Sequence, residues 1–371
     1  QYAQTQSMDF RLPQQEWPPG DNEVDQAVEM IKHASRRIIV AGGGVIAAGA
    51  AAELQALARQ LDCPVLTTVD GRGVIPEDDE LCVGNYYNSA GIYDAIQGAD
   101  LTIAVGTKFA VGVDGQFHAQ TPPGKMIQID IDGNMIGRTH KADLGILADA
   151  KAALTALNAS LDELQPNDGQ FNQTIWEARD GVRQAMRARL GDDWPRVMDT
   201  IRAKLPRNGL FVRDQTISAY NWGNQQFPIY EPRTSMNPTS GAIGPGFPMA
   251  VGAAIGSGRK TVVIHGDGGF MFHATELATA AQYQVPLVVC VFNDSGYGVL
   301  RWLQTNRFGR VNETDLGKVA FAKMAESMGV PAQRVQSAAE FETALDTAMQ
   351  AQGPYHIDVD MEHFAPMEIS V

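Results

Sequence analysis

Short runs of β-branched and other apolar residues alternate along this chain with segments whose apolar residues recur at helical spacing. In the first half, apolar runs bounded by glycine, proline or charged residues predict four strands, RRIIVAGGG, CPVLTTV, DLTIAVG and KMIQIDID. Segments such as AAAELQALARQL lie between them and have the period of an amphipathic helix. This alternation predicts a parallel sheet with helices on both faces.

The same alternation resumes after a polar helical stretch at residues 161–195, which suits a connector. Four further strands are predicted at NGLFVRD, KTVVIHGD, PLVVCVFND and PYHIDVD. We therefore expect an α/β protein with two tandem Rossmann-like domains, at residues 23–160 and 196–371. Each should have three layers and a mainly parallel sheet.

The first 22 residues have the composition of a linker rather than of a packed domain. They are rich in Gln and Pro, which favour an extended chain without a core. Linkers join domains, so we expect that a further N-terminal domain, missing from this chain, precedes Gln1.

Composition and charge narrow the classes of function. The 371 residues include 29 Lys and Arg against 43 Asp and Glu, a formal net charge of −14, whereas nucleic-acid binding depends on clustered basic residues. No apolar run approaches the ~20 residues that span a membrane. Three well-separated cysteines, Cys63, Cys82 and Cys290, form neither a disulfide framework nor a CxxC metal motif. We expect a soluble cytoplasmic protein with reduced core cysteines and with neither a nucleic-acid nor a membrane partner.

Two weaker signals have more ordinary explanations. AGGGVIAAGA, residues 41–50, stands between a predicted strand and a helix, but its glycines do not have the GxGxxG spacing of a dinucleotide-binding turn. A tight βα turn is the favoured interpretation. His265 stands at a predicted strand end and is expected to be structural rather than catalytic. The seven histidines form no HExxH zinc motif.

Residues 261–300 carry the strongest signal for chemistry. They have the order strand, acidic glycine-rich turn, helix, strand and second acidic glycine-rich turn. Both turns should lie at the carboxyl edge of a parallel sheet, which makes Asp267 and Asp294 neighbours. Two hard oxygen ligands suit Mg²⁺ or Ca²⁺, and the N–H groups of Gly268 and Gly269 at a helix start suit a phosphate. The pattern predicts a metal ion that holds a diphosphate, and the alternative is two ordinary βα turns with incidental acids.

GDG, a helix and then N-[ND]-x-G-Y-G resemble the cofactor motif of thiamine-diphosphate enzymes of the acetolactate synthase, pyruvate oxidase and benzoylformate decarboxylase group. The resemblance implies that Asp267, Asp294 and the carbonyl of Gly296 bind Mg²⁺. The family usually has Asn where this chain has Asp294, so the extra negative charge should alter metal affinity. The resemblance implies further cofactor contacts at Gly266, Gly268, Gly269, Ser295 and Tyr297.

Other segments resemble the same family. SGAIGPGFPMAVGAAIG includes Gly241 and resembles the segment that holds a bulky apolar residue under the thiamine. Ile243 would be that residue and would bend the cofactor into a V shape; a glycine-rich helix start is the structural alternative. FVRDQTISAYNW resembles the first strand and loop of the diphosphate-binding domain, where Thr216 and Ser218 could reach the diphosphate. Residues 127–157 resemble the end of the family's central domain.

By resemblance, the expected activity is thiamine-diphosphate- and Mg²⁺-dependent decarboxylation of a small-molecule 2-oxo acid, with carboligation in the manner of acetolactate synthase. Val299 and Leu300 follow the metal turn, where the family lines its substrate pocket. GYGVLRWLQ resembles benzoylformate decarboxylase, so an aromatic 2-oxo acid decarboxylase is the alternative. The acetolactate synthase branch often binds FAD through arginines, and Lys108 and Val111 stand at those positions, which argues against FAD.

In this family the glutamate that activates the cofactor belongs to an N-terminal pyrimidine-binding domain, and no acid in this chain can be assigned that role. The missing N-terminal part or another chain would supply it. Active sites in the family form between subunits, so a homodimer or homotetramer is expected. Two functions of other classes remain open: an NAD-dependent oxidoreductase that uses residues 41–50, and an inactive fragment that only binds cofactor.

Overall fold

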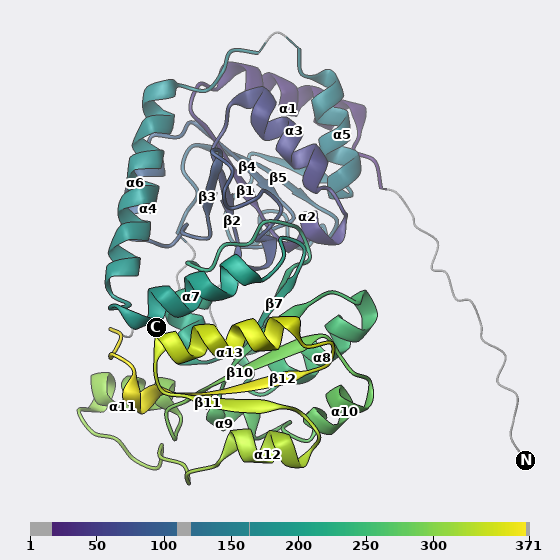
Figure 1. Cartoon of the computed structure of the whole chain (residues 1–371). Helices are drawn as coiled ribbons and strands as arrows, with labels where there is room; N and C mark the ends of the chain where they lie inside the picture. The colour runs from purple at the N-terminus through teal and green to yellow at the C-terminus, as the bar shows by residue number, and fades with distance from the viewer. Residues whose placement is uncertain (1–16, 110–119, 163, 369–371) are drawn as a thin grey trace, which may run out of the picture.

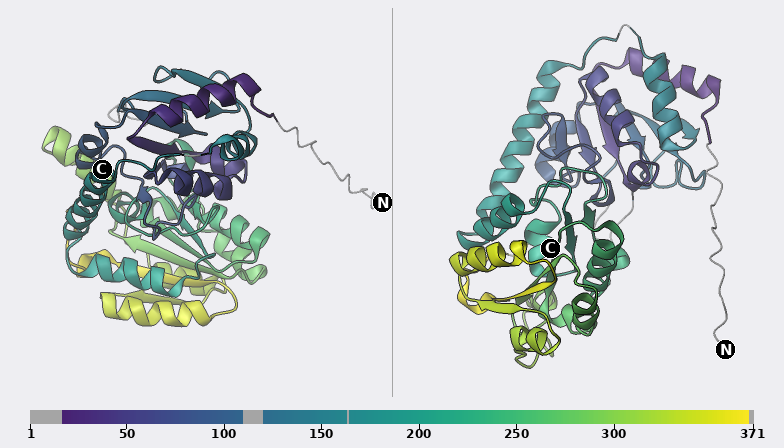
Figure 2. Two further views of the ribbon diagram at one scale, coloured as in Figure 1. Left: turned by 90° about the horizontal axis from the view of Figure 1, so that it is seen from above. Right: turned by 45° about the vertical axis from the view of Figure 1, so that its right-hand side comes forward.

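The computed structural model describes residues 17–109, 120–162 and 164–368. They form two layered α/β domains, one above the other in Figure 1. A long helix, α6 (Gly169–Ala188), runs along the side of the first domain toward the second. The two further views in Figure 2 show the same separation into two bodies. Val111, where an FAD-binding arginine was expected, lies outside the described residues.

The first sheet consists of β1 (Arg37–Ala41), β2 (Val65–Thr67), β3 (Cys82–Gly84), β4 (Leu101–Val105), β5 (Lys125–Asp130) and β6 (Leu144–Leu147). All six are parallel, in the order β3-β2-β1-β4-β5-β6. Every residue of β1 and β4 is buried, which explains their unbroken apolar runs.

Helices cover both faces of this sheet. One face is covered by α1 (Asp21–His33), α3 (Ala51–Leu61) and α5 (Ala150–Ser160). The other face is covered by α4 (Ala90–Ile96) and α6. The segment predicted as a connector therefore also completes the first domain, because Phe171 and Ile175 of α6 belong to its core.

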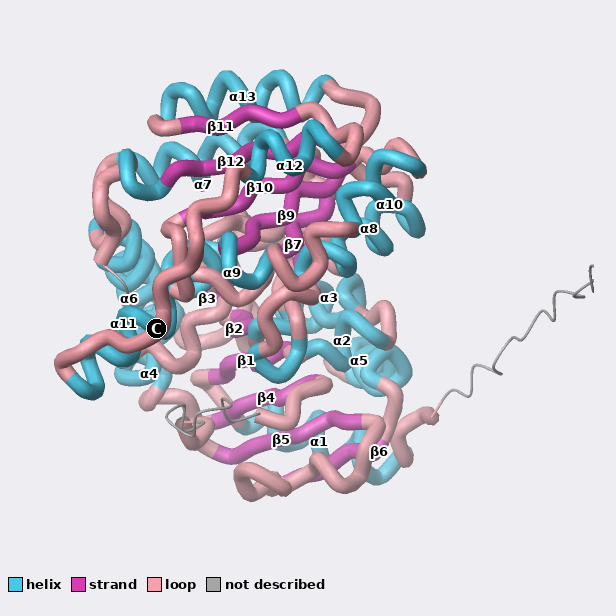
Figure 3. The backbone as a smooth tube through the Cα atoms, turned by 90° about the horizontal axis from the view of Figure 1, so that it is seen from below, coloured by secondary structure: helices cyan, strands magenta, loops and turns pink. Residues whose placement is uncertain are grey.

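The second sheet consists of β7 (Leu210–Arg213), β8 (Ser235–Met236), β9 (Thr261–Gly266), β10 (Leu287–Asn293), β11 (Ala332–Val335) and β12 (Tyr355–Asp360). These strands are also all parallel, in the order β11-β12-β10-β9-β7-β8. Figure 3 shows the strands of the two sheets one set above the other. The prediction of two tandem α/β domains with parallel sheets is confirmed.

Helices flank the second sheet as well. α7 (Asp193–Lys204) and α13 (Ala338–Gln350) cover one face. The core on the other face includes residues of α8 (Gly246–Ser257), α9 (Asp267–Phe270), α10 (Glu276–Gln282) and α12 (Phe321–Ser327). By contrast, α11 (Gly298–Phe308) has no buried residue. Among the described residues, no helix is long and apolar enough to cross a membrane.

A buried ion pair of the first domain lies at the boundary with the second domain. Arg72, in the segment after β2, contacts Glu77 through two N–O distances of 2.7 Å, with side chains 0% and 6% exposed. The guanidinium also donates to the carbonyl of Gly223 at 2.9 Å and to those of Asn224 and Phe227. Since both charges are removed from water, loss of one would leave the other uncompensated.

Replacing Arg72 with Met should lower the free energy of unfolding by about 3–5 kcal/mol, because the Glu77 carboxylate would stay buried without its partner. Urea unfolding followed by tryptophan fluorescence measures this loss. The control is Arg207→Met, which removes an exposed pair between Arg207 of the second domain and Asp78 of the first (side chains 54% and 48% exposed). It should cost less than about 1 kcal/mol. Equal losses in the two variants would contradict the importance of burial.

Candidate cofactor site

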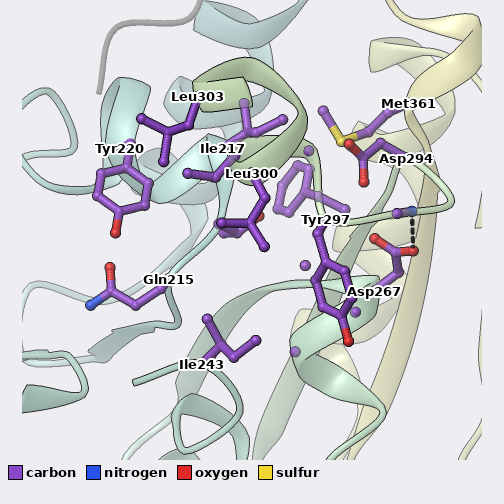
Figure 4. Close-up of a pocket in the computed structure, with 18 of the residues that line it drawn as sticks. Gln215, Ile217, Tyr220, Ile243, Asp267, Asp294, Tyr297, Leu300, Leu303 and Met361 are labelled. Carbon is purple, nitrogen blue, oxygen red and sulfur yellow. Dashed lines mark hydrogen bonds between the residues drawn. The ribbon is translucent and has the colours of Figure 1, made fainter. Parts of the chain in front are cut away.

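The strand order of the second sheet places a crevice at the carboxyl ends of β7 and β9. The chain leaves β7 toward β8 on one side, whereas β9 and β10 lie on the other side. Open α/β sheets bind ligands at such a reversal of strand order. A cavity of about 210 Å³ opens there (Figure 4), lined by the turns after β7, β9 and β10, the loop before α8 and the start of α11.

Two acids, Asp267 buried and Asp294 half-buried, stand at the ends of neighbouring strands. Asp267 directly follows β9 and Asp294 directly follows β10, and both line the cavity. Oδ2 of Asp267 accepts a hydrogen bond from the N–H of Gly296 at 2.9 Å, dashed in Figure 4. Oδ1 of Asp267 is buried without a hydrogen-bond partner. Burial, with the charge of Asp294, raises the pKa of Asp267 to about 7, and burial also raises the pKa of Asp294.

This acid pair fits a divalent cation. Two carboxylates that share a buried site repel each other when both are charged, and a cation between them would offset the repulsion and give the unpartnered oxygen a partner. Carboxylate and carbonyl oxygens suit Mg²⁺ or Ca²⁺ rather than a soft metal. The described residues contain no group of three or more His, Cys, Asp or Glu that is placed to hold a metal ion, so backbone, water or ligand oxygens would complete the coordination.

Glycines in both turns make room for these groups. A Cβ on Gly298 would lie 2.1 Å from Oδ2 of Asp294. A Cβ on Gly268 would lie 2.6 Å from the ring of Tyr297. Both distances are far below van der Waals contact, so a Cβ at either position would displace the side chain that faces it. The glycines of the motif are therefore explained by the side chains that lie against them.

An apolar side chain faces the cavity from a glycine-rich loop. Ile243 is 40% exposed and stands across the cavity from Leu300 and Leu303 (Figure 4). Gly241 and Gly244 have φ angles of 68° and 103°, in the region that favours glycine. The shape of the loop thus depends on these two glycines. A large exposed apolar side chain at the cavity wall is suited to support a flat ligand.

Most of the predicted site residues lie together in this cavity. Those that line it are Thr216, Gly241, Ile243, Gly266, Asp267, Gly268, Gly269, Asp294, Gly296, Tyr297, Val299 and Leu300. Ser218 and Ser295 do not. Ser218 is fully buried just before a π-helical turn at Ala219–Gly223, and Ser295 lines two neighbouring cavities instead.

Several lining residues were not predicted: Gln215, Ile217, Tyr220, Phe292, Gly298, Leu303 and Met361. The first three fall in the segment 211–222, which was singled out as a whole. Leu303 is three residues after Leu300 on α11, so helical spacing could have found it. Met361 directly follows β12, whose carboxyl end meets the same sheet edge.

His265 and the cysteines have no place in the cavity. His265 is fully buried in β9, and burial lowers its pKa. The thiols of Cys63, Cys82 and Cys290 are buried and unpaired, and burial raises the pKa of each. Buried thiols of raised pKa are poor nucleophiles, so these residues contribute packing rather than chemistry.

The glycines of the first domain's turn are accounted for by packing. A Cβ on Gly42 would lie 2.2 Å from the carbonyl oxygen of Gly106, and a Cβ on Gly44 would lie 2.6 Å from its Cα. The turn after β1 therefore packs so closely against the turn after β4 that a side chain would not fit between them. Lys108, just beyond, is exposed and lines a separate crevice at this sheet edge.

Fold and site together are typical of proteins that bind a diphosphate cofactor at a sheet edge through a divalent cation. The family model of the thiamine pyrophosphate enzyme central domain matches residues 24–157. The model of the thiamine pyrophosphate enzyme C-terminal TPP binding domain matches residues 217–359. The chain belongs to the thiamine pyrophosphate enzymes.

Curated relatives include enzymes of several activities. The chain is 34% identical to the probable acetolactate synthase large subunit of Methanocaldococcus jannaschii, over 91% of this chain and 59% of the relative. It is 31% identical to the glyoxylate carboligase of Escherichia coli O157:H7, over 92% of this chain and 61% of the relative. It is 34% identical to the probable 2-ketoarginine decarboxylase of Pseudomonas aeruginosa, over 76% of this chain and 50% of the relative. The chain thus spans about three fifths or less of the length of these relatives.

A solved structure shows the same fold. A candidate thiamin diphosphate-dependent enzyme from Mycobacterium smegmatis superposes with a TM-score of 0.73 at 23% identity. The similarity covers 94% of this chain and 66% of that chain. At this level of identity the likeness supports the architecture and not the activity.

Arg301 offers a test of the cation site. Its Nη1 lies 3.4 Å from Oδ2 of Asp294 and its Nη2 lies 2.8 Å from Oδ1 of Asp315. Replacing Arg301 with Gln removes a positive charge beside the acids, so Mg²⁺ should bind about threefold to tenfold more tightly by isothermal titration calorimetry. The control Arg307→Gln, in the last turn of the same helix, should change the affinity by less than about twofold. Weaker Mg²⁺ binding by the Arg301 variant would contradict this charge effect.

Proposed function

We propose that this chain forms the central and diphosphate-binding domains of a thiamine-diphosphate- and Mg²⁺-dependent enzyme that decarboxylates a 2-oxo acid and, like acetolactate synthase, joins the product to a second carbonyl compound. The observation that carries the proposal is the acid pair formed by buried Asp267 and half-buried Asp294, with one oxygen of Asp267 left unpartnered, at the edge of a cavity that also contains Ile243. Relatives of this chain include an acetolactate synthase and a carboligase.

The residues at the cavity divide between the two ends of the cofactor. Asp267 and Asp294, with the carbonyl of Gly296, would hold Mg²⁺ against the diphosphate. The backbone N–H groups of Gly268 and Gly269, at the start of α9, would donate to the phosphate oxygens. The side chain of Thr216, in the turn after β7, lies against Gly266. A Cβ on Gly266 would be 3.0 Å from Oγ1 of Thr216.

Ile243 would support the ring system and bend the cofactor. When bound, thiamine diphosphate supplies a ring that accepts the electrons of the breaking carbon–carboxylate bond. The apolar wall formed by Ile243, Val299, Leu300 and Leu303 would exclude water from this reaction. The protein then contributes binding, orientation and a dry surrounding.

The described residues do not supply every group that the proposed reaction needs. Of the described residues, Asp267 and Asp294 are the acids that line the cavity, and both are assigned to the cation. Protonation of the cofactor's pyrimidine ring therefore requires an acid from a pyrimidine-binding domain, on another part of the protein or on another chain. We propose a homodimer or homotetramer in which the complete site forms between subunits.

The apolar wall of the cavity and the relatives of the chain together indicate a substrate class. Leu300 and Leu303 are 47% and 41% exposed toward the cavity side of α11, so they can cover an apolar substrate tail. We propose a small aliphatic 2-oxo acid, because acetolactate synthases stand among the relatives. An aromatic 2-oxo acid is the second candidate, favoured by these same exposed leucines. Turnover of pyruvate against phenylglyoxylate by the complete protein distinguishes the two.

Thermal stability in the presence of cofactors tests the class of enzyme. Thiamine diphosphate with Mg²⁺ should raise the melting temperature of the complete protein, because a ligand that binds only the folded state stabilises it. NAD alone should leave the melting temperature unchanged. Stabilisation by NAD and not by thiamine diphosphate would overturn the proposed function in favour of an oxidoreductase.

Replacing Asp267 with Ala should abolish thiamine-diphosphate-dependent decarboxylation, a loss of about 10³-fold or more, because the cation loses a buried ligand. The release of CO₂ from a 2-oxo acid measures this activity. The control Asp346→Ala removes an acid on α13 that is 53% exposed and pairs with Lys204, and it should retain full activity. Unchanged activity of the Asp267 variant would exclude the metal assignment. Cofactor binding without turnover in the unmodified protein would favour the inactive fragment.

A further inference from the structure

A third buried carboxylate lies next to the cavity without lining it. Asp214 directly follows β7 and is fully buried. Its Oδ2 accepts a hydrogen bond from the N–H of Gly244 at 2.8 Å, and its Oδ1 accepts one from the N–H of Gly246 at 2.9 Å. Gly246 is the first residue of α8, where backbone N–H groups have no partner inside the helix, and Gly244 lies two residues before it. One carboxylate therefore fixes the segment that immediately follows Ile243.

Packing leaves this carboxylate little freedom. A Cβ on Gly246 would lie 2.8 Å from the Cβ of Asp214, and a Cβ on Gly269 would lie 2.7 Å from its Oδ2. Nε2 of His265, itself fully buried, is 3.5 Å from the same oxygen. Asp214 is thus enclosed by the loop of Ile243 on one side and by the turn after β9 on the other.

We propose that Asp214 is a positioning residue: through its bonds to Gly244 and Gly246 it holds Ile243 at the height where that side chain supports the ring system of the bound cofactor. The inference rests on the proposed function and deepens it. Asp214 acts through Ile243 and has no place among the residues that line the cavity. Its loss should therefore affect the ring end of the cofactor and spare the diphosphate end.

The substitution Asp214→Asn separates these two ends. Asn has nearly the same size, so the contacts to Gly246 and Gly269 are kept. One of its two side-chain acceptors becomes an NH₂ group, which cannot accept from either backbone N–H. The loop loses one charge-assisted hydrogen bond and Ile243 loses its fixed position, while the turn after β9 stays in place.

Two probes report the result in the complete protein with saturating Mg²⁺. Thiamine diphosphate should bind about 10-fold to 100-fold more weakly to the Asp214→Asn variant, by isothermal titration calorimetry. Inorganic pyrophosphate, which has no ring system, should bind with an affinity changed by less than about twofold. The variant Ile243→Ala should show the same selective loss. The double variant should lose no more than about twofold beyond the larger single loss, because both changes remove one interaction.

A second variant keeps the test decisive if Asp214→Asn does not fold. Gly246→Ala places a Cβ against the Cβ of Asp214. It pushes the two residues apart and so breaks the hydrogen bond between them, while the carboxylate remains. It should give the same selective loss of thiamine diphosphate over pyrophosphate. Equal weakening of both probes would overturn the inference, since Asp214 would then be a general support of the fold. Unchanged binding of both probes in the variants would overturn it as well.

Failure of the proposed function gives a different result. If the unmodified complete protein binds neither thiamine diphosphate nor pyrophosphate in the presence of Mg²⁺, the cofactor site itself is refuted. If it binds both and the variants show no selectivity, only the role of Asp214 is refuted.

Discussion

The second domain depends on how it compensates the charge of three aspartates, each of which directly follows one of three neighbouring strands. Asp214 follows β7, Asp267 follows β9 and Asp294 follows β10; the first two are buried, and the side chain of Asp294 is 18% exposed. Asp214 is compensated within the chain, because two backbone N–H groups donate to it. Asp267 keeps an unpartnered oxygen beside Asp294. Similar positions in the sheet therefore have different roles. The carboxylate of Asp214 binds backbone N–H groups of its own chain, whereas the pair Asp267 and Asp294 would be stabilised by a bound cation.

The central strands of both sheets could be predicted from the sequence, and the edge strands could not. Central parallel strands are buried on both faces, so β1, β4, β9 and β10 appear as apolar runs. The four unpredicted strands, β3, β6, β8 and β11, are the four sheet edges. They have two to four residues each. An edge strand needs less apolar surface and is fixed by pairing with a neighbour that is distant in sequence, so its local pattern is weak.

The site residues that lie in one continuous strand–turn–helix segment could be predicted from the sequence. Those that depend on contacts between distant segments could not. Residues 261–300 contain both acids and the glycines that make room for them, and parallel strands must bring their turns to one edge. The importance of Asp214 is invisible in sequence, because its partners Gly244 and Gly246 lie about 30 positions further on. For Ser218, by contrast, the sequence predicted a site residue that does not line the cavity. It stands two residues after Thr216, yet a π-helical turn begins at the next residue and Ser218 is fully buried.

The first domain contributes no described residue to the cavity lining, but it contacts the segment that forms one wall of the cavity. Arg72 donates to the carbonyls of Gly223, Asn224 and Phe227, at the end of the π-helical segment and just beyond it. Carbonyls at the end of such a segment have no donor inside it, and the guanidinium of Arg72 supplies one. The same segment carries Tyr220, which lines the cavity, and begins just after Ile217 and Thr216, which line it too. A shift of the first domain would therefore reach the cofactor cavity through this wall, on the side away from the acid pair in Figure 4.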